Sequence, residues 1–542
     1  MGTPLVVTQA SAGTSAWIPL DDTKNPFQVG FGAVVAGTLT YTIEHTFDAV
    51  QNSAIMPTAF PNATATAQTG NAQGNYTFPV TAVRINVTAF TSGSVTLTLV
   101  QGTSTGSGFN YNPVTGADLA AELAAIGVYS ATTAAPMGGP GAGMGVCNPA
   151  YVPAGLVGLS GYTDKMHANF GNYIHPASGS IMGFIPRFWH KWGTGSNGLA
   201  VNQLSLVQHE PSLQDFLVAN GYAVDRMFWD GGAIKSGVFV DKYMCSNNAG
   251  IAASIKNGKP LSSAAAHNPI SELTGAFTNA YYSAIDAAKA RGAGFFCSSR
   301  FIFAGLARVS YAHGQQSGNT TYCAWYDATN NFPKGCNNSA LRDVQDASVL
   351  YTSDGYSNCG QTGSGVPFEK TTHNGQACGI SDTNGLLWEV TPGITSNGSS
   401  FFVLKPTVSM AALNSGNASA SDVWGAASLA ANYDSLGATY GALTNASTTK
   451  LYGNAAQVFS EAQSGNAWEV TGLGIPLAGG VGGTNTFGND VLYDYRPNDM
   501  CPISGGSWNY NSDAGVWALN LNATRSASYD IAGFRCAIYP TT

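Results

Sequence analysis

Apolar and polar residues alternate one by one over much of the first hundred positions of this 542-residue chain. Leu39, Tyr41 and Ile43 are separated by polar residues, and the same period of two recurs over 83–88 and 95–99. This period indicates strands with one buried face. The run Thr91-Ser92-Gly93 lies between the last two stretches and predicts a hairpin turn. We therefore expect residues 1–102 to form an all-β, antiparallel sandwich.

The alternation stops at residue 103, where Gly, Ser and Pro become frequent up to residue 150. Such a composition is typical of a linker. An Ala- and Leu-rich stretch within it, residues 117–126, predicts a short helix. A helix with so few large apolar residues is marginal alone. This favours packing between copies of the chain, and hence a homo-oligomer.

From residue 151 onward the patterns of strands and helices are mixed. Strands are predicted at 185–189 and 238–243. Two amphipathic helices follow, with apolar faces made by Tyr281, Ile285 and Ala288 and by Ile302, Leu306 and Val309. Ser298 or Ser299 is available to cap the second helix. A Gly-, Ala-, Ser- and Asn-rich insertion at about 395–500 interrupts the region, and Phe401-Phe402-Val403-Leu404 predicts a strand in it.

Charged residues make up only 10% of the chain, against roughly 25% in ordinary globular proteins. The net charge is −8 and Lys and Arg do not cluster, so we expect no binding to nucleic acid or anionic membranes. Apolar runs are too short for membrane insertion. The first residues lack the pattern of a secretion signal, which favours synthesis in the host cytoplasm. We predict no cofactor, although the Asp- and Asn-containing loops leave room for a structural calcium ion.

The C-terminal region has an unusual organisation. Gly505-Gly506-Ser507-Trp508 and Gly533-Phe534-Arg535-Cys536 bracket a polar segment with almost no charge. Asn, Ser and Tyr supply adaptable hydrogen bonds and rigid contact area, as in antibody paratopes. An ordinary hairpin with a polar loop is the alternative. The predicted ligand-binding residues, expected on one exposed face, are Asn509, Tyr510, Asn511, Ser512, Asp513, Val516, Asn520, Asn522 and Tyr529.

A second motif precedes this segment, from His373-Asn374-Gly375 to Trp388-Glu389-Val390. It resembles the N-G-x-x-G-L-x-D-x-x-G-N-V-W-E-W signature of the formylglycine-generating-enzyme-like branch of the C-type lectin fold. That branch also ends in G-G-S-W and then G-F-R. The resemblance implies an α+β, C-type lectin fold domain over residues 151–542.

Glycine and tryptophan at these positions suit tight turns around a core. We expect Trp388 and Trp508 to be buried and close in space, and Glu389 to pair with Arg535 or a backbone amide. The predicted scaffold residues are Trp388, Glu389, Gly505, Gly506, Trp508, Gly533, Phe534 and Arg535.

The family contains both enzymes and binding proteins. Its oxidases carry two cysteines after G-G-S-W that bind copper, whereas no cysteine lies between Trp508 and Gly533. We therefore predict no catalytic residues, because Asn or Ala cannot replace a thiol nucleophile. The residues otherwise resemble phage tropism determinants and other variable proteins diversified by retroelements.

This resemblance implies a virion protein that binds a host-cell surface protein or glycan and assembles as a trimer. Residues 1–102 resemble small β modules of phage structural proteins, which implies that they contact other virion proteins; a stand-alone ligand-binding sandwich is the alternative. A structural decoration protein of the capsid or tail and a formylglycine-generating-type oxidase are the alternatives.

Overall fold

The computed structural model forms two compact units, Met1–Thr115 and Gly116–Thr542, which are described separately. The described residues are 4–22, 27–48, 50, 56–101, 129–130, 145–149, 151–165, 167–209, 211–317, 320, 323–327, 332–333, 335–413, 429–452, 459–477 and 487–540. The helix predicted at 117–126, and most of the linker, lie outside them.

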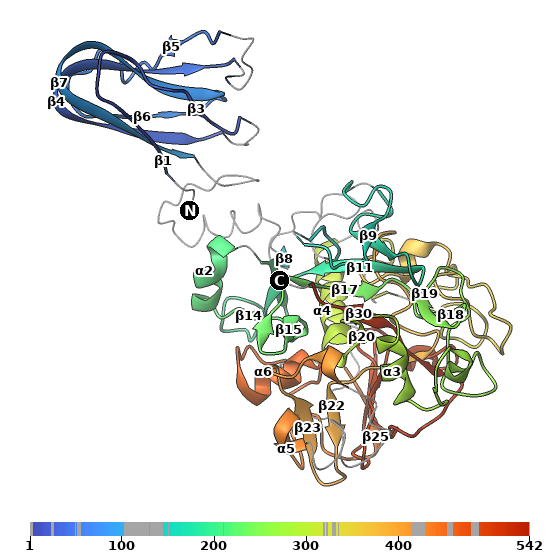
Figure 1. Ribbon diagram of the computed structural model, residues 1–542. Helices are drawn as coiled ribbons and strands as arrows, with labels where there is room; N and C mark the ends of the chain where they lie inside the picture. The colour runs from blue at the N-terminus through green and yellow to red at the C-terminus, as the bar shows by residue number, and fades with distance from the viewer. Residues whose placement is uncertain are drawn as a thin grey trace. The chain divides into compact units, whose positions relative to one another are not determined.

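The first unit is built on one antiparallel sheet (Figure 1). Two long strands, β4 and β7, pair with each other from end to end. The strands are β1 (Leu5–Gln9), β2 (Gly13–Thr14), β3 (Ile18–Pro19), β4 (Val29–Thr46), β5 (Phe60–Pro61), β6 (Ala72–Tyr76) and β7 (Ala82–Gln101). The β-rich, antiparallel character predicted for this region is confirmed.

The predicted hairpin turn at Thr91-Ser92-Gly93 is wrong, because these residues lie inside β7. Gly93 is paired with Gly37 of β4, and their φ angles are +91° and +113°. A Cβ atom on Gly93 would lie 1.6 Å from the carbonyl oxygen of Ala36. The glycines therefore allow both strands to bend together, and Figure 1 shows the sheet doubling back there.

The bend creates the core of this unit. Phe31 and Leu97 come from one half of the long strands, Tyr41 and Ile85 come from the other, and all four belong to one buried cluster. β1 and β6 extend the first half, while β2, β3 and β5 extend the second. The apolar residues that alternate with polar ones in the sequence are therefore buried on both sides of the bend, as predicted.

The second unit combines many short strands with few helices. Its helices are α2 (Gln214–Ala219), α3 (Ser283–Lys289), α4 (Arg300–Ser317), α5 (Leu429–Asn432) and α6 (Gly465–Gly472). Its strands are β8 (Tyr129–Ser130), β9 (Val157–Gly158), β10 (Asn172–His175), β11 (Ser180–Pro186), β12 (Phe188–Trp192), β13 (Leu204–Gln208), β14 (Ala223–Val224), β15 (Trp229–Asp230), β16 (Ala233–Ile234), β17 (Gly237–Asp241), β18 (Cys245–Asn248), β19 (Ile251–Ser254), β20 (Phe296–Cys297), β21 (Trp388–Val390), β22 (Ile394–Ser396), β23 (Phe401–Leu404), β24 (Tyr433–Gly437), β25 (Thr448–Leu451), β26 (Val491–Asp494), β27 (Ile503–Ser504), β28 (Leu519–Asn520), β29 (Ala532–Gly533) and β30 (Cys536–Ile538).

Two six-stranded sheets organise this unit. One has the order β20-β30-β17-β11-β10-β9 and contains the C-terminal strand β30. The other has the order β25-β26-β28-β27-β21-β29. It contains the end of the motif from His373 to Val390 in β21 and the start of Gly533-Phe534-Arg535-Cys536 in β29. Two smaller sheets, with the strand orders β14-β12-β13-β8 and β22-β23-β24, are the other sheets of three or more strands among the described residues of this unit.

Most elements predicted for this region are present. The strand predicted at 185–189 is divided between β11 and β12 at Arg187, and β17 ends at Asp241, two residues before the predicted end of the second strand. α3 and α4 are the predicted helices, with Ile285 and Ile302 buried. The Ile302 amide donates to Ser299 Oγ at 3.2 Å, which confirms this serine as a cap. β23 matches the strand predicted in the insertion. Among the described residues, no helix is long and apolar enough to cross a membrane.

Candidate ligand-binding surface

The Gly505-Gly506 pair directs the chain out of β27. Both residues have left-handed φ angles, +94° and +96°. A Cβ on Gly505 would lie 2.9 Å from the carbonyl oxygen of Thr383, and one on Gly506 would lie 2.4 Å from the Cβ of Ala514. The turn therefore requires glycine both for its backbone angles and for close packing.

The two sequence motifs meet in one sheet. β21, which carries Trp388 and Glu389, lies between β27 and β29. Glu389 pairs with Ser504 in antiparallel register and with Gly533 in parallel register. A Cβ on Gly533 would lie 2.3 Å from the carbonyl oxygen of Leu261, so this position also needs glycine. The strands that start and end the polar segment are thus held by the same central strand.

A buried ion pair fastens this arrangement. Arg535 Nε donates to Glu389 Oε2 at 2.6 Å, and Nη2 donates to Oε1 at 2.5 Å. Neither side chain is more than 1% exposed. Burial alone lowers the pKa of Arg535, but the Glu389 carboxylate outweighs this effect and raises it. The predicted pairing is confirmed, and its bidentate geometry makes it specific to arginine.

The tryptophans differ from each other. Trp388 and Phe534 are fully buried in one cluster. Trp508 is only half-buried, at the edge of a separate cluster, so the prediction that it is buried is wrong. It lies where the chain leaves the core, and its amide donates to the carbonyl of Leu386 at 3.0 Å. The ring of Tyr510 packs edge-on against Trp388, with centroids 4.9 Å apart.

Most of the predicted ligand-binding side chains are at the surface. The exposed ones are Asn509, Asn511, Ser512, Asn522 and Tyr529, and the half-buried ones are Tyr510, Asp513 and Asn520. Val516 is the exception, because its side chain is 1% exposed within the main hydrophobic cluster. Its prediction as a binding residue is wrong, since residues 514–519 turn inward between the two exposed stretches.

Several contacts connect the exposed stretches. Asn520 Oδ1 accepts from the Asn522 amide at 2.7 Å, and the Asn520 side chain partly opposes the effect of burial on the pKa of Tyr510. The Tyr529 ring lies 6.2 Å from the buried ring of Tyr281. Tyr529 thus packs against a buried ring, as Tyr510 does against Trp388.

Burial raises the pKa of both titratable members of the first stretch, Tyr510 and Asp513. The 3₁₀ helix Asn511–Asp513 presents Asn511, whose φ is +50° and whose amide donates to the carbonyl of Asn337 at 2.5 Å. This stretch consequently has a fixed backbone even though its side chains face solvent.

Sequence reasoning missed the residues that support the segment from other loops. Asn337 holds Asn511 as described above. Asp490 Oδ2 accepts from the Trp517 amide at 2.8 Å and packs where a Cβ on Gly515 would lie. Nothing in the sequence links these positions, because each lies more than twenty residues from its partner in the segment and neither belongs to a periodic pattern.

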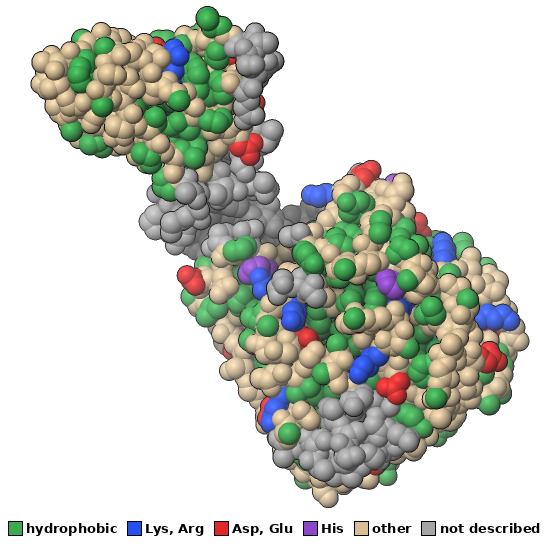
Figure 2. All heavy atoms as spheres, viewed as in Figure 1, with side chains coloured by type: hydrophobic (Ala, Val, Ile, Leu, Met, Phe, Trp, Pro, Cys, Tyr) green, Lys and Arg blue, Asp and Glu red, His purple; other side chains and the backbone are tan. Residues whose placement is uncertain are grey.

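The chemistry of this surface is that of uncharged hydrogen-bonding groups. It offers side-chain amides, hydroxyls and phenols, and no thiol or imidazole occurs between Trp508 and Gly533. All nine cysteines of the chain are free, and all except Cys147 are buried. Figure 2 shows charged side chains scattered rather than clustered on the face in view. The arrangement suits recognition of polar groups by hydrogen bonds.

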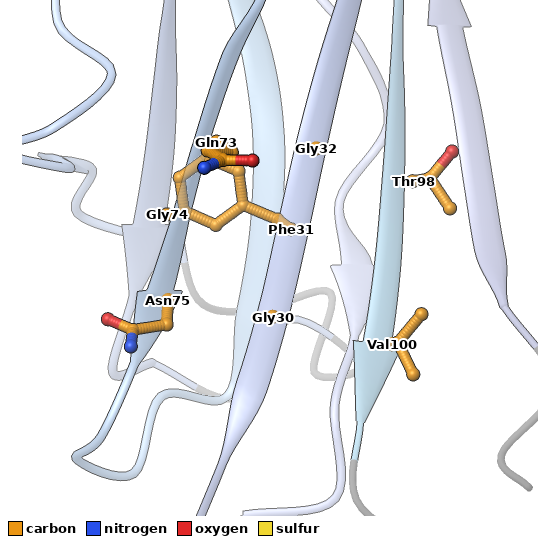
Figure 3. Close-up of a pocket in the computed structure, with 8 residues that line it drawn as sticks. All are labelled: Gly30, Phe31, Gly32, Gln73, Gly74, Asn75, Thr98 and Val100. Atoms are coloured by element: carbon orange, nitrogen blue, oxygen red, sulfur yellow. The ribbon is translucent and has the colours of Figure 1, made fainter.

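A separate open hollow lies on the sheet of the first unit (Figure 3). Its residues are Gly30, Phe31, Gly32, Gln73, Gly74, Asn75, Thr98 and Val100. A Cβ on Gly30 or Gly32 would touch nothing within 4 Å, so these glycines leave bare backbone between β6 and β7. The sequence analysis assigned no site here.

Comparisons with known proteins give only distant similarities. No protein-family model and no curated protein matches the chain. Among solved structures, the Major Tropism Determinant M1 variant is 10% identical over 74% of each chain, with a TM-score of 0.25. The U1 variant is 10% identical over 66% of this chain, with a TM-score of 0.25, and the match spans 63% of its own length. A chain from a structure entitled "Bacillus endospore appendages form a novel family of disulfide-linked pili" is 21% identical over 18% of this chain and 84% of its own, with a TM-score of 0.13.

Proposed function

We propose that this protein is a phage receptor-binding protein in which a C-type lectin fold domain presents residues 509–529 to a host-cell surface protein or glycan. The observation that carries the proposal is the contrast around β21. The strands at both ends of the segment are fixed by buried pairing and by the Arg535–Glu389 ion pair, while five predicted contact residues between them are exposed.

A fixed backbone favours binding. Ordering the protein then subtracts less from the binding free energy, so modest polar contacts yield useful affinity. The exposed side chains, Asn509, Asn511, Ser512, Asn522 and Tyr529, hydrogen-bond to many partners and contain no ionisable group that acts near neutral pH. Such a surface tolerates changes of sequence because its residues contribute little to the core.

The remaining parts of the proposal concern the particle. The first unit docks onto other virion proteins, and a trimeric assembly multiplies a modest affinity through effective concentration. The protein acts by binding rather than catalysis, since the segment after Gly505-Gly506-Ser507-Trp508 has no thiol pair. A structural decoration protein of the capsid or tail is the second candidate.

The test is saturable binding of fluorescently labelled chain to a panel of bacterial strains, measured by flow cytometry. Binding lost after protease treatment of the cells identifies a protein receptor, and binding lost after periodate oxidation identifies a glycan. Uniform, unsaturable binding to every strain would contradict the proposal and favour a decoration protein. A near-copy of the codons for residues 507–534 beside a reverse-transcriptase gene would add that the segment is diversified.

A further inference from the structure

Two tight loops of the second unit face each other beneath the end of the polar segment. One contains His267 within a turn closed by bridge pairing of Ala264 with His267 and of Ser262 with Pro269. The other runs from Asp354 to Cys359 and is closed by pairing of Ser353 with Gly360. The side chains of His267, Asp354 and Cys359 each provide one donor atom, and these atoms all lie within 4.8 Å of one another.

The hydrogen bonds of His267 define its donor and acceptor atoms. Its Nδ1 lies 2.7 Å from the carbonyl oxygen of Asp530, which can only accept, so Nδ1 carries a proton. In a neutral imidazole, Nε2 then carries a lone pair. This atom lies 2.6 Å from Asp354 Oδ2, a second acceptor. Two acceptors at this distance require a proton or another cation.

The rest of the site favours a metal ion. A histidine that ligates a metal through one nitrogen usually donates its other N–H to a carbonyl, as His267 does to Asp530. Asp354 is oriented by the Asn268 side-chain amide at 3.0 Å and by the Tyr356 amide at 2.8 Å. The ring of Tyr356 stacks on His267 with centroids 4.1 Å apart. These contacts orient the carboxylate and the imidazole toward each other, and an ion between them would have to widen the 2.6 Å separation.

The donor set is one nitrogen, one oxygen and one sulfur. Zinc accepts this mixture, whereas calcium and magnesium prefer oxygen alone. All three side chains are buried, so the thiol and the imidazole are shielded from bulk solvent. A further thiol, that of Cys336, donates to the carbonyl of Asn358 at 3.5 Å, next to Cys359, and belongs to the same buried cluster. Its sulfur is not among the donor atoms that lie within 4.8 Å of one another, so the protein supplies three ligands here and water would complete a four-coordinate ion.

The surrounding chain would gain from such an ion. Between the end of α4 and β21, the described residues contain no strand and only one short helix, the 3₁₀ helix Phe368–Thr371. A long stretch without strands or long helices forms few backbone hydrogen bonds within itself, so its conformation depends on other contacts. Metal binding closes such loops and contributes directly to folding.

We propose that His267, Asp354 and Cys359 form a buried site for a zinc-class ion that joins the two loops. The site is connected to the end of the polar segment by the hydrogen bond that His267 Nδ1 donates to the carbonyl of Asp530. It therefore supports the end of the polar segment, whatever that segment binds.

The test is metal analysis of full-length protein produced with zinc and purified without chelator. We expect one zinc ion per chain. Exchange with Co²⁺ should produce a thiolate-to-metal charge-transfer band, because Cys359 binds as a thiolate. Chelation should lower the melting temperature of the wild-type protein.

Matched cysteine variants locate the site. Cys359→Ser should abolish the band, whereas Cys501→Ser, at a buried thiol outside this group, should keep it. Asp354→Asn provides a second variant if Cys359→Ser does not fold. Wild-type protein without stoichiometric zinc would show that a shared proton alone joins His267 and Asp354, and would overturn the proposal. A band that persists in Cys359→Ser and disappears in Cys245→Ser would also overturn it, by moving the metal to the second buried group, Asp241, Cys245 and Cys536.

Discussion

The chain after Met500 contains two regions that differ in burial and in the role of their side chains. The scaffold region, made by β27, β29, Phe534 and Arg535, is buried and contains charge that is fully paired. The exposed region, within residues 509–513 and 520–529, presents polar side chains to solvent at Asn509, Asn511, Ser512, Asn522, Ser526, Ser528 and Tyr529, while Leu521 and Arg525 between them are buried. The difference shows that the backbone conformation depends on buried contacts, while the outward side chains contribute little to it. A surface can then change its specificity without losing its fold.

The largest effect is expected where the scaffold is broken at its ion pair. Arg535→Ala leaves the Glu389 carboxylate buried without its cation, which should cost on the order of 3–5 kcal/mol of unfolding free energy. Urea denaturation measures this, with Lys259→Ala as the exposed control. The double variant Arg535→Met/Glu389→Met should be more stable than the single one. Equal stability of Arg535→Ala and wild type would mean that the pair does not hold the scaffold.

A comparison of Trp388 with Trp508 tests how strongly each ring contributes to the stability of the fold. Trp388→Ala removes a fully buried ring and should cost about 3–5 kcal/mol. Trp508→Ala removes a half-buried ring and should cost clearly less. Both values come from the same denaturation experiment. A larger loss for Trp508→Ala would place the core on the other side of the Gly505-Gly506 turn.

The stability of the second unit should also fall in acid, because of the buried His373. Burial lowers the pKa of His373 to about 3, while an unfolded histidine titrates near 6.5. The unfolded state therefore binds more protons between these values, so stability falls as the pH drops below 6.5. The contribution of His373 between pH 6.5 and 4 is on the order of 3 kcal/mol.

The experiment compares unfolding free energies of wild type and His373→Gln at pH 7, 5.5 and 4. Asp382 acts in the opposite direction, because burial raises its pKa to about 6, but it is present in both proteins. The variant should lose less stability on acidification than wild type. Parallel pH profiles would show that His373 does not remain neutral in the folded state.

The turn between the two regions gives a smaller effect. Gly506→Ala combines a left-handed φ of +96° with a Cβ only 2.4 Å from that of Ala514, and should cost about 1–3 kcal/mol. Gly465→Ala is the matched control, since its φ is +73° but its added Cβ meets nothing within 4 Å. The difference in melting temperature between the two variants isolates the steric contact. No difference would mean that the turn is adaptable.

The scaffold was more predictable from sequence than its supports. Glu389 and Arg535 belong to motifs whose order implies their proximity, and the structure pairs them. By contrast, Asn337 contacts the segment, and His267 contacts Asp354, through loops that share no period or spacing. Tertiary contacts between irregular loops leave no local pattern in a sequence.

Two errors have a common cause. Thr91-Ser92-Gly93 has the composition of a turn, but Gly93 uses its positive φ to bend a continuous strand. Val516 lies in a polar stretch, yet an irregular inward turn buries it. Composition indicates which backbone angles are accessible, whereas the direction of the chain depends on neighbours that are distant in sequence.

The central claim is that the exposed residues bind while the buried ones only position them. Cell binding should therefore be compared for wild type, for Asn509→Ala/Ser512→Ala/Asn522→Ala, and for the control Ser399→Ala/Thr448→Ala/Ser464→Ala, whose residues are equally exposed polar groups of the same unit. Both triple variants should unfold within about 0.5 kcal/mol per substitution of wild type. The account predicts that only the first loses binding or changes the strains that it binds. Unchanged binding by a folded first variant would contradict it.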